Sequence, residues 1–358
     1  MLILLALVTG GVAVVTTLLS LSRAKAWWIR IWDFPRLQLC VLAFGALLLW
    51  ILGVDWLAWP QNLFTLALAA VLVFQGTLVW RYTPLAPREV QQSQSNDTST
   101  QLSLVISNVL QTNRQSDRLL SVIREADPDV MLFCEVDDWW ESRFDVLAVS
   151  HPYVVRHPLP NTYGLLLRSR LDLKDAVVDF LVQPERPSIQ AKIVLRNGVR
   201  VWLNCVHPPP PVPGESAEST ERDSALLQVA RRVHRATGPV IVCGDLNEVA
   251  WSRSTRLFQK ISGLLEPRKG RGFFSTFHAR YPGFRAPIDH VFHSDHFRLV
   301  RMRRLGYVGS DHFPVHIVLS YEPQATAEQE APHADAEDVE EANETVARST
   351  PGPGRRGG

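Results

Sequence analysis

The chain has 358 residues, enough for one large domain or two ordinary ones, and 46% of them are apolar. Its net charge is only +1, but the acidic residues gather after Tyr321, so the middle of the chain is mildly basic, which suits a phosphate-bearing substrate without establishing binding to nucleic acid. The four cysteines have no CxxC spacing, which argues against a disulfide framework and against a zinc site.

Three apolar runs occupy the first 80 residues. Met1 to Ser22 carries no charged side chain, and Leu37–Val54 and Leu63–Trp80 are each about 18 residues long, close to the ~20 that cross a bilayer. A cleaved signal peptide is the alternative for the first run, but that run lacks a basic start and two more runs follow it. We therefore predict a membrane anchor of three transmembrane helices over residues 1–81, inserted in the lipid bilayer. Amphipathic rings settle at the water interfaces, where we expect Trp27, Trp28, Trp50, Trp56, Trp59 and Trp80.

The charges around these runs suggest an orientation. The first loop holds Arg23, Lys25, Arg30 and Arg36, the second loop holds no basic residue, and further arginines follow the third run. Counting basic residues places the first loop and everything after Trp80 in the cytoplasm. Against this, the segment WWIRIWDFPR is suited to lying along the membrane surface.

Three further segments follow the anchor. Residues 82–100 are polar and have no apolar period, so they are predicted to form a linker. Residues 322–358 are acidic and contain almost no large apolar side chain, so they are predicted to be disordered. Residues 101–321 lie between these two segments and are predicted to form one domain.

The domain at 101–321 is rich in short apolar runs typical of buried strands. Asn197-Gly198 between two of these runs indicates a hairpin, and helical patterns occur at 116–127 and 221–237. Such a mixture of buried strands, a hairpin and helices favours two packed sheets covered by helices. The predicted strands are 102–110, 129–136, 163–169, 188–196, 199–207, 239–247, 287–294 and 313–321.

Polar side chains recur at the ends of these strands. If the strand ends share one edge, so many ionisable and amide groups would meet at one rim, which is costly unless a cation or a ligand compensates them. The residues concerned are Asn108, Glu135, His207, Asp245, Asn247, Asp289, Asp311 and His312.

The residue types at this rim point to one chemistry. Carboxylates and asparagines without a Cys/His cluster form a hard oxygen site that suits Mg²⁺ or Mn²⁺ better than zinc. Two histidines beside such an ion can donate hydrogen bonds to anionic oxygens, which together suits metal-assisted hydrolysis of a phosphate ester. The chain has no GxxxxGK[ST] loop, which argues against nucleotide-driven phosphoryl transfer.

The motifs ISNVL, DPDVMLFCEV, NCVHPP, GDLNEVAWS, PIDHVF and GSDHFPV, in this order, resemble the endonuclease/exonuclease/phosphatase superfamily, which shares the deoxyribonuclease I fold. The resemblance covers roughly Leu102 to Tyr321. It implies an α/β (α+β) four-layer β-sandwich flanked by helices, here preceded by three transmembrane helices. With the apolar helices, the chain is similar to bacterial membrane-anchored members, which implies a multi-pass protein of the bacterial cytoplasmic (inner) membrane with its catalytic domain on the cytoplasmic side.

The resemblance also implies a metal site. Glu135 matches the carboxylate that binds Mg²⁺ (or Mn²⁺) in the family, Asn108 stands beside it, and Asp311 matches a second acid on the metal side. Family members usually carry Gln before this Glu, whereas Cys134 stands here. That Gln is not a metal ligand, so the expected metal site does not depend on it.

The catalytic roles implied by the resemblance fall on five residues. Asp245 matches the aspartate that orients or deprotonates the attacking water, and Asn247 assists it. His312 matches the histidine that contacts the scissile phosphate, with Asp289 as its carboxylate partner. His207 matches a histidine that faces the phosphate or the leaving group.

The leading hypothesis is a membrane-anchored, Mg²⁺-dependent phosphoesterase that hydrolyses a phosphodiester or a phosphomonoester by in-line attack of water. Its substrate is a lipid headgroup or a nucleic acid, and a nuclease acting on DNA or RNA is the alternative within this class. A non-catalytic membrane scaffold that retains the fold is the alternative of another class. Two basic groups, at 267–277 and 301–305, would hold phosphates or anionic headgroups, or else lie on a solvated loop and a solvated strand face. No protein partner is inferred.

Overall fold

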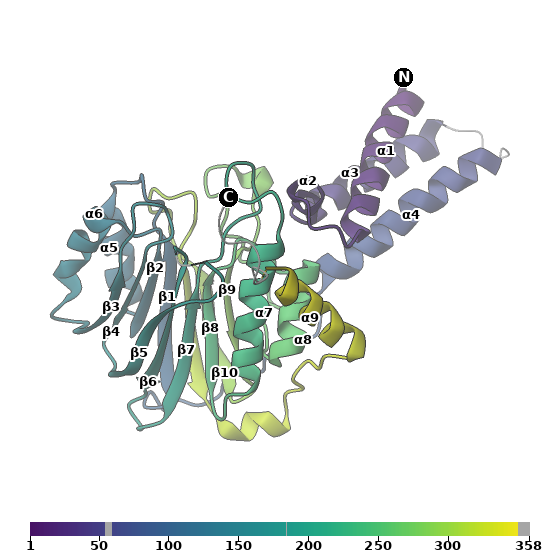
Figure 1. Ribbon diagram of the computed structural model, residues 1–358. Helices are drawn as coiled ribbons and strands as arrows, with labels where there is room; N and C mark the ends of the chain where they lie inside the picture. Colours follow the sequence, from purple (N-terminus) through teal and green to yellow (C-terminus); the bar gives the residue numbers. More distant parts are fainter. Residues whose placement is uncertain (54–58, 184, 350–358) are drawn as a thin grey trace.

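The computed structural model describes residues 1–53, 59–183 and 185–349. It has two parts: a bundle of apolar helices, and a larger layered domain from whose side the bundle projects (Figure 1). Val54, at the end of the second predicted span, and Trp56, one of the predicted interfacial tryptophans, lie outside the described residues, as do residues 350–358 of the tail.

The N-terminal helices agree with the predicted anchor. Within the described residues, three helices are long and apolar enough to cross a membrane, over Leu2–Leu21, Arg36–Gly53 and Asn62–Trp80. Trp50 is buried in the bundle with its ring 4.7 Å from that of Phe64, so it packs between helices instead of facing an interface. The elements are α1 (Leu2–Leu21), α2 (Trp27–Arg30), η1 (Ile31–Asp33), α3 (Arg36–Gly53) and α4 (Trp59–Trp80).

The layered domain contains two sheets. The first has the strand order β10-β11-β1-β2-β4-β3 and the second β5-β6-β7-β8-β9. In each sheet one pair of neighbours is parallel, β1 with β2 and β7 with β8, and the other neighbours are antiparallel. The strands are β1 (Gln101–Asn108), β2 (Val130–Cys134), β3 (Tyr153–His157), β4 (Leu165–Ser169), β5 (Leu173–Phe180), β6 (Pro187–Val194), β7 (Arg200–Val206), β8 (Val240–Asp245), β9 (Asp289–His293), β10 (Phe297–Arg304) and β11 (Val315–Tyr321).

Four layers result from which faces of the sheets are apolar. The largest apolar cluster, with Leu104, Leu132 and Ile241 among its members, lies between the two sheets. A second cluster joins the outer face of the first sheet to α5 and α6, and a third joins the outer face of the second sheet to α7 and α8. The order helices, sheet, sheet, helices confirms the predicted four-layer sandwich (Figure 1). The helices of this domain are α5 (Ser116–Ala126), α6 (Asp138–Arg143), η2 (Phe144–Leu147), α7 (Thr220–His234), α8 (Arg253–Ser262), η3 (Pro282–Phe284), η4 (Pro323–Ala327) and α9 (Ala336–Ser349).

The prediction of a disordered tail is wrong for the residues after 322 that the structure describes. Helix α9 packs against α7 and α8, with Ala342 fully buried between them. The acidic residues that suggested disorder instead pair with basic residues of α8: Glu341 with Arg253, and Asp338 with Lys260. The tail is ordered because a small apolar stripe and complementary charge meet one surface of the domain.

Placing a charge at the centre of this contact should release the helix. We expect Ala342→Asp to speed amide exchange of residues 336–349 by at least about 10-fold, equivalent to about 1.4 kcal/mol, because a buried, unpaired carboxylate is costly. Hydrogen exchange read by mass spectrometry measures this. Ala347→Asp, on an exposed position of the same helix, is the matched control. Equal exchange in both variants would contradict the packing.

The predicted linker at 82–100 is not a free tether. Tyr82 and Val90 are fully buried, and the backbone around Gln91 runs beside β10, where the Leu299 amide donates to the Gln91 carbonyl oxygen over 3.0 Å. This segment therefore extends the edge of the first sheet and attaches the anchor closely to the domain.

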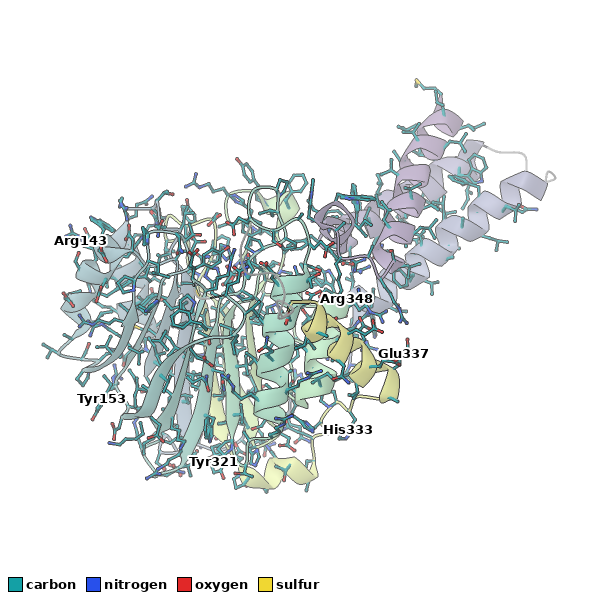
Figure 2. The ribbon with its side chains drawn as sticks, in the orientation of Figure 1. Arg143, Tyr153, Tyr321, His333, Glu337 and Arg348 are labelled. Carbon is teal, nitrogen blue, oxygen red and sulfur yellow. The ribbon has the colours of Figure 1, made fainter. Side chains whose placement is uncertain are left out.

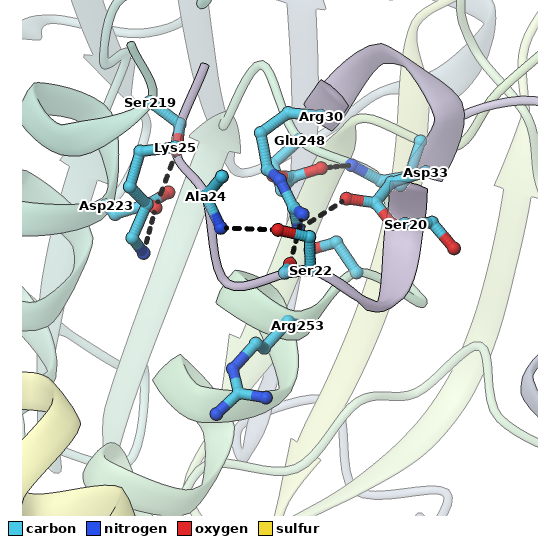
Figure 3. Close-up of polar contacts among 12 residues, drawn as sticks. Ser20, Ser22, Ala24, Lys25, Arg30, Asp33, Ser219, Asp223, Glu248 and Arg253 are labelled. Carbon is cyan, nitrogen blue, oxygen red and sulfur yellow. Dashed lines mark hydrogen bonds and ion pairs between the residues drawn. The ribbon is translucent and has the colours of Figure 1, made fainter. Parts of the chain in front are cut away.

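A second attachment joins the segment between α1 and α3 to the layered domain. Lys25 Nζ lies 2.9 Å from Asp223 Oδ2, and the indole of Trp251 donates to the backbone oxygen of Asp33 over 2.7 Å. The Asp33 carboxylate is itself buried beside Arg30 (Figure 3). The anchor and the domain are thus joined by buried polar contacts, and the first loop lies on the same side of the bundle as the domain.

Candidate active site

The strand ends gather the predicted polar residues at one end of the sandwich. Asn108 ends β1 and Asp245 ends β8, and these two strands face each other across the core. Because β2 is parallel to β1, Glu135 emerges beside Asn108, and because β7 is parallel to β8, His207 emerges beside Asp245. This end lies at the top of Figure 2, opposite the labelled Tyr321, the last residue of β11.

Asp245 lies at the centre of the site and is almost fully buried. Its Oδ2 atom accepts a hydrogen bond of 2.9 Å from Asn108 Nδ2. The same oxygen is 3.7 Å from His207 Nε2 and 3.6 Å from His312 Nε2. One amide and two imidazoles from three different strand ends therefore converge on one carboxylate oxygen.

Glu135 is connected to Asp245 through Asn108. Asn108 Nδ2 also donates to Glu135 Oε1 over 2.8 Å, and the backbone amide of Gln111 donates to Glu135 Oε2 over 3.1 Å. The backbone of Glu135 has φ +62°, a left-handed conformation that turns the chain as it leaves β2. This turn brings the carboxylate to the rim, where it is half-buried.

His312 and Asp289 form a buried pair beside this centre. His312 Nδ1 lies 2.8 Å from Asp289 Oδ2. Burial alone would lower the pKa of His312, but the carboxylates of Asp289 and Asp245 outweigh it and raise that pKa to about 10. The imidazole is therefore a cation at neutral pH, with Nδ1 held by Asp289 and Nε2 free to donate to a second anionic oxygen.

Two glycines make these positions accessible. Gly244 has φ +146°, and a Cβ atom there would lie 1.9 Å from the carbonyl oxygen of Val206, so only glycine lets β8 approach the end of β7. Gly309 has φ +92°, and a Cβ there would lie 2.6 Å from Asn113 Oδ1. The close packing at Gly244 keeps Asp245 beside His207. Gly309 begins the loop that carries His312.

Two predicted residues are attached to the site less directly. The Asn247 backbone amide donates to Asp245 Oδ1 over 3.0 Å, but its side-chain amide donates to the Pro208 carbonyl oxygen. The side chain of Asp311 has one hydrogen-bond contact among the described residues, with the Ser310 hydroxyl at 3.4 Å. The structure therefore brings six of the eight predicted side chains into one connected cluster, with Asn247 and Asp311 next to it in the chain.

Sequence reasoning did not identify Ser310 and Arg222 as supports of the cluster, and it left Tyr163 open between a site contact and a strand-edge position. The Ser310 hydroxyl donates to the backbone oxygen of Asn108 and accepts from the amide of His312, which ties the last loop to β1. Arg222 is fully buried, donates to the backbone oxygen of Asn247 over 3.0 Å and pairs with Glu248. The ring of Tyr163 lies 5.4 Å from that of His207. The sequence carried no signal for Arg222, because an arginine on a helix ordinarily faces solvent.

The donor atoms fit a divalent cation. Asp245 and Asp289 present carboxylate oxygens within 4.8 Å of each other, and the charged imidazole of His312 lies beside them as a hydrogen-bond donor, not as a ligand. Glu135 offers a second oxygen ligand beside the Asn108 amide, and within the described residues it has amide hydrogen-bond partners but no Lys or Arg ion pair. Within the described residues, the buried Oδ1 atom of Asp289 has no hydrogen-bond partner. Oxygen-rich, negatively charged sites of this kind suit hard divalent ions.

Solved structures of similar fold include two animal proteins and one bacterial protein. The D. rerio TDP2 structure complexed with a single-strand DNA product has a TM-score of 0.53 and 17% identity, covering 62% of this chain and 99% of that one. The Beutenbergia cavernae endonuclease/exonuclease/phosphatase has a TM-score of 0.51 and 19% identity, covering 62% and 72%. The human Nocturnin catalytic domain with bound sulfate has a TM-score of 0.50 and 17% identity, covering 66% and 96%. At these identities the likeness shows the fold.

The family follows from the sequence itself. No curated protein matches the chain. The model of the endonuclease/exonuclease/phosphatase family matches residues 95–312, which is more than half of the chain and includes all eight residues of the candidate site. The match begins in the segment that runs along β10 and ends at His312. The chain that builds this carboxylate and imidazole cluster between two sheets therefore belongs to the endonuclease/exonuclease/phosphatase family.

Proposed function

We propose that this protein is a membrane-anchored, Mg²⁺-dependent phosphoesterase that hydrolyses a phosphodiester or a phosphomonoester by in-line attack of water. The observation that carries the proposal is the convergence of Asn108, His207 and His312 on one oxygen of Asp245. The hydrogen bond from Asn108 and the surrounding packing hold this carboxylate in one orientation, as a group that orients water must be.

The residues of the chain divide the work between the attacking water and the phosphate. Asp245 accepts a hydrogen bond from the water and takes up its proton as the new P–O bond forms; the P–O bond to the leaving oxygen breaks on the opposite side, and that oxygen departs as an alcohol after taking a proton from solvent or from an imidazole of the site. His312, held as a cation by Asp289, donates from Nε2 to a phosphate oxygen and stabilises the charge that develops there. His207, whose Nδ1 atom has no partner in the described part of the chain, is positioned to contact the phosphate or the leaving group.

Glu135 and Asn108 would hold Mg²⁺, with Asp311 as a nearby acid. The ion, when bound, supplies a Lewis acid to the phosphate oxygens. The protein must present oxygen ligands that no Lys or Arg side chain already neutralises. Glu135 meets this requirement, because within the described residues its hydrogen bonds come from amide groups.

Removing one ligand tests the metal assignment. We expect chelation by EDTA to abolish hydrolysis of bis(p-nitrophenyl) phosphate and Mg²⁺ to restore it. Glu135→Gln should raise the Mg²⁺ concentration for half-maximal rate by at least about 10-fold, since losing even a supporting partner of a ligand costs that much. Glu141→Gln, on α6 and away from the cluster, is the control. An unchanged Mg²⁺ requirement in Glu135→Gln would exclude Glu135 as a ligand.

Two substrate classes follow from two observations. A similar fold is known in complex with a DNA product, which favours a nucleic acid. Apolar helices suited to a bilayer adjoin the catalytic domain directly, which favours a lipid headgroup. Hydrolysis of lipid substrates in mixed micelles, compared with single-stranded DNA and RNA at the same Mg²⁺ concentration, separates them. We further propose that the domain lies on the cytoplasmic face of a bacterial inner membrane, which protease accessibility in spheroplasts would check.

A further inference from the structure

A groove of about 860 Å³ lies between the anchor and the catalytic domain, outside the candidate active site. One wall is the first two turns of α3, with Leu37 and Val41; the opposite wall includes Phe273, Phe274 and Met302 from the domain. Val41 is 67% exposed. Because α3 is suited to crossing a bilayer, the apolar wall of the groove continues directly into the part of the helix that lipid tails would surround.

Exposed apolar side chains surround the groove near the beginning of α3. Gln38 of α3 donates to the backbone oxygen of Gly283 over 2.7 Å, so the helix contacts the η3 loop at the edge of the groove. Beside this contact, Phe284 of η3 is 74% exposed, and Trp28 and Ile31 of the first loop are each about half exposed. Exposed aromatic and aliphatic side chains next to the end of an apolar helix are typical of the membrane interface.

Arg285 and Arg304 line the other end of the groove, and Arg303 adjoins it from β10 with its side chain bonded to His316 on the opposite face of the sheet. Within the described residues, each guanidinium bonds only to backbone oxygens or to a ring nitrogen and none pairs with a carboxylate. Arg285 and Arg304 lie 5.0 and 4.3 Å from the ring of Phe313, so two like charges approach the same side chain.

This charge is not balanced by the protein. Burial and the neighbouring Arg285 both lower the pKa of Arg304. The Nε atom of Arg285 is buried without a hydrogen-bond partner in the described part of the chain. Clustered guanidiniums with free donors and no acid nearby favour an anion, and phosphate is the anion whose geometry they match best.

The two ends of the groove together select the ligand. A soluble phosphate would leave the apolar wall unused, and a neutral hydrocarbon would leave the charges of Arg285 and Arg304 uncompensated. Only an amphiphile with an anionic phosphate at one end satisfies both. We propose that this groove binds one anionic phospholipid of the bilayer, with its phosphate held by Arg285 and Arg304 and an acyl chain lying along α3. The basic segment 301–305, ambiguous in the sequence, thereby gains a ligand that fits its surroundings.

The proposal is tested by lipid binding to the full-length protein, independently of hydrolysis. Native mass spectrometry of the detergent-purified protein, titrated with phosphatidylglycerol or phosphatidylcholine, reports each bound lipid. We expect one phosphatidylglycerol bound at least about 10-fold more tightly than phosphatidylcholine. The double variant Arg285→Gln/Arg304→Gln should lose this preference. The control Arg200→Gln/Arg301→Gln removes the same charge from exposed positions outside the groove and should keep it.

A second variant separates lipid binding from misfolding. Val41→Trp fills the apolar wall from an exposed position and leaves the arginines intact, so it should weaken phosphatidylglycerol binding by a similar factor. Equal binding of the two lipids, or equal retention by the charge variant and its control, would overturn the proposal. Equally tight binding of glycerophosphoglycerol, which has no acyl chains, would show a site for soluble anions and would overturn it as well.

Discussion

Asp245→Asn should lower the rate of phosphodiester hydrolysis by about 10²–10⁴-fold, the range lost when a positioned acid–base group is removed. The amide is isosteric with the carboxylate but is a far weaker proton acceptor. It would also face the Asn108 amide, which now donates to Asp245 Oδ2 over 2.9 Å. The measurement is the steady-state rate on bis(p-nitrophenyl) phosphate with saturating Mg²⁺, together with the thermal unfolding midpoint to show that the fold persists.

The matched control for this change is Asp117→Asn. Asp117 is an exposed aspartate in the first turn of α5 and lies outside the cluster, so the control should hydrolyse the substrate at the rate of the unmodified protein. If Asp245→Asn and the control hydrolyse the substrate equally fast, Asp245 has no catalytic role. A protein without measurable, Mg²⁺-dependent hydrolysis in any form would instead favour the non-catalytic scaffold.

The second large effect concerns the junction between anchor and domain. Asp33→Ala should lower the free energy of unfolding by about 3–5 kcal/mol, the cost of leaving a buried partner charge uncompensated. The Asp33 carboxylate lies between Arg30, at 3.1 Å, and Arg36, and all three side chains are almost fully buried. Denaturant unfolding in detergent micelles, followed by tryptophan fluorescence, measures the change.

An exposed ion pair provides the contrast. Glu337 of α9 pairs with Arg23, but both side chains are largely exposed to solvent. Glu337→Gln should therefore change the free energy of unfolding by no more than about 1 kcal/mol. If Asp33→Ala costs no more than Glu337→Gln, the buried ion pairs of Asp33 do not stabilise the segment between α1 and α3 that contacts the domain.

The fold could be predicted from the sequence where a strand is buried on both faces and therefore appears as a continuous apolar run. All eight predicted strand runs contain a strand, and the Asn197-Gly198 hairpin joins β6 to β7 with Gly198 at φ +86°. The strands that were missed, β3, β5 and β10, are all at sheet edges, where one face meets solvent and the apolar run disappears. Helix α9 was missed because it buries mainly Ala342 and Thr345, too little apolar surface to mark a helix in an acidic segment.

The candidate site was predictable to the extent that strand order predicts proximity. Polar residues after parallel strands had to emerge together, and Asn108, Glu135, His207 and Asp245 do so. The orientation of a loop side chain could not be predicted in the same way. Asn247 turns its amide to the Pro208 carbonyl oxygen because a local backbone acceptor is available. The supporting contacts of Arg222 depend on how α7 packs against the loop after β8, which no local pattern encodes.

The packing of residues 82–100 along β10 has a consequence for how the protein meets its substrate. A flexible coil of that length would have an r.m.s. end-to-end distance of roughly 25 Å, so the domain could move that far from the helices. Here the segment forms backbone hydrogen bonds with β10, and the loop between α1 and α3 contacts the domain through Lys25 and Asp223. The candidate active site is therefore held in a fixed position and orientation relative to the N-terminal helices. In the bilayer proposed above, encounters would depend on lateral diffusion within the membrane, which would favour substrates that are confined to the same membrane.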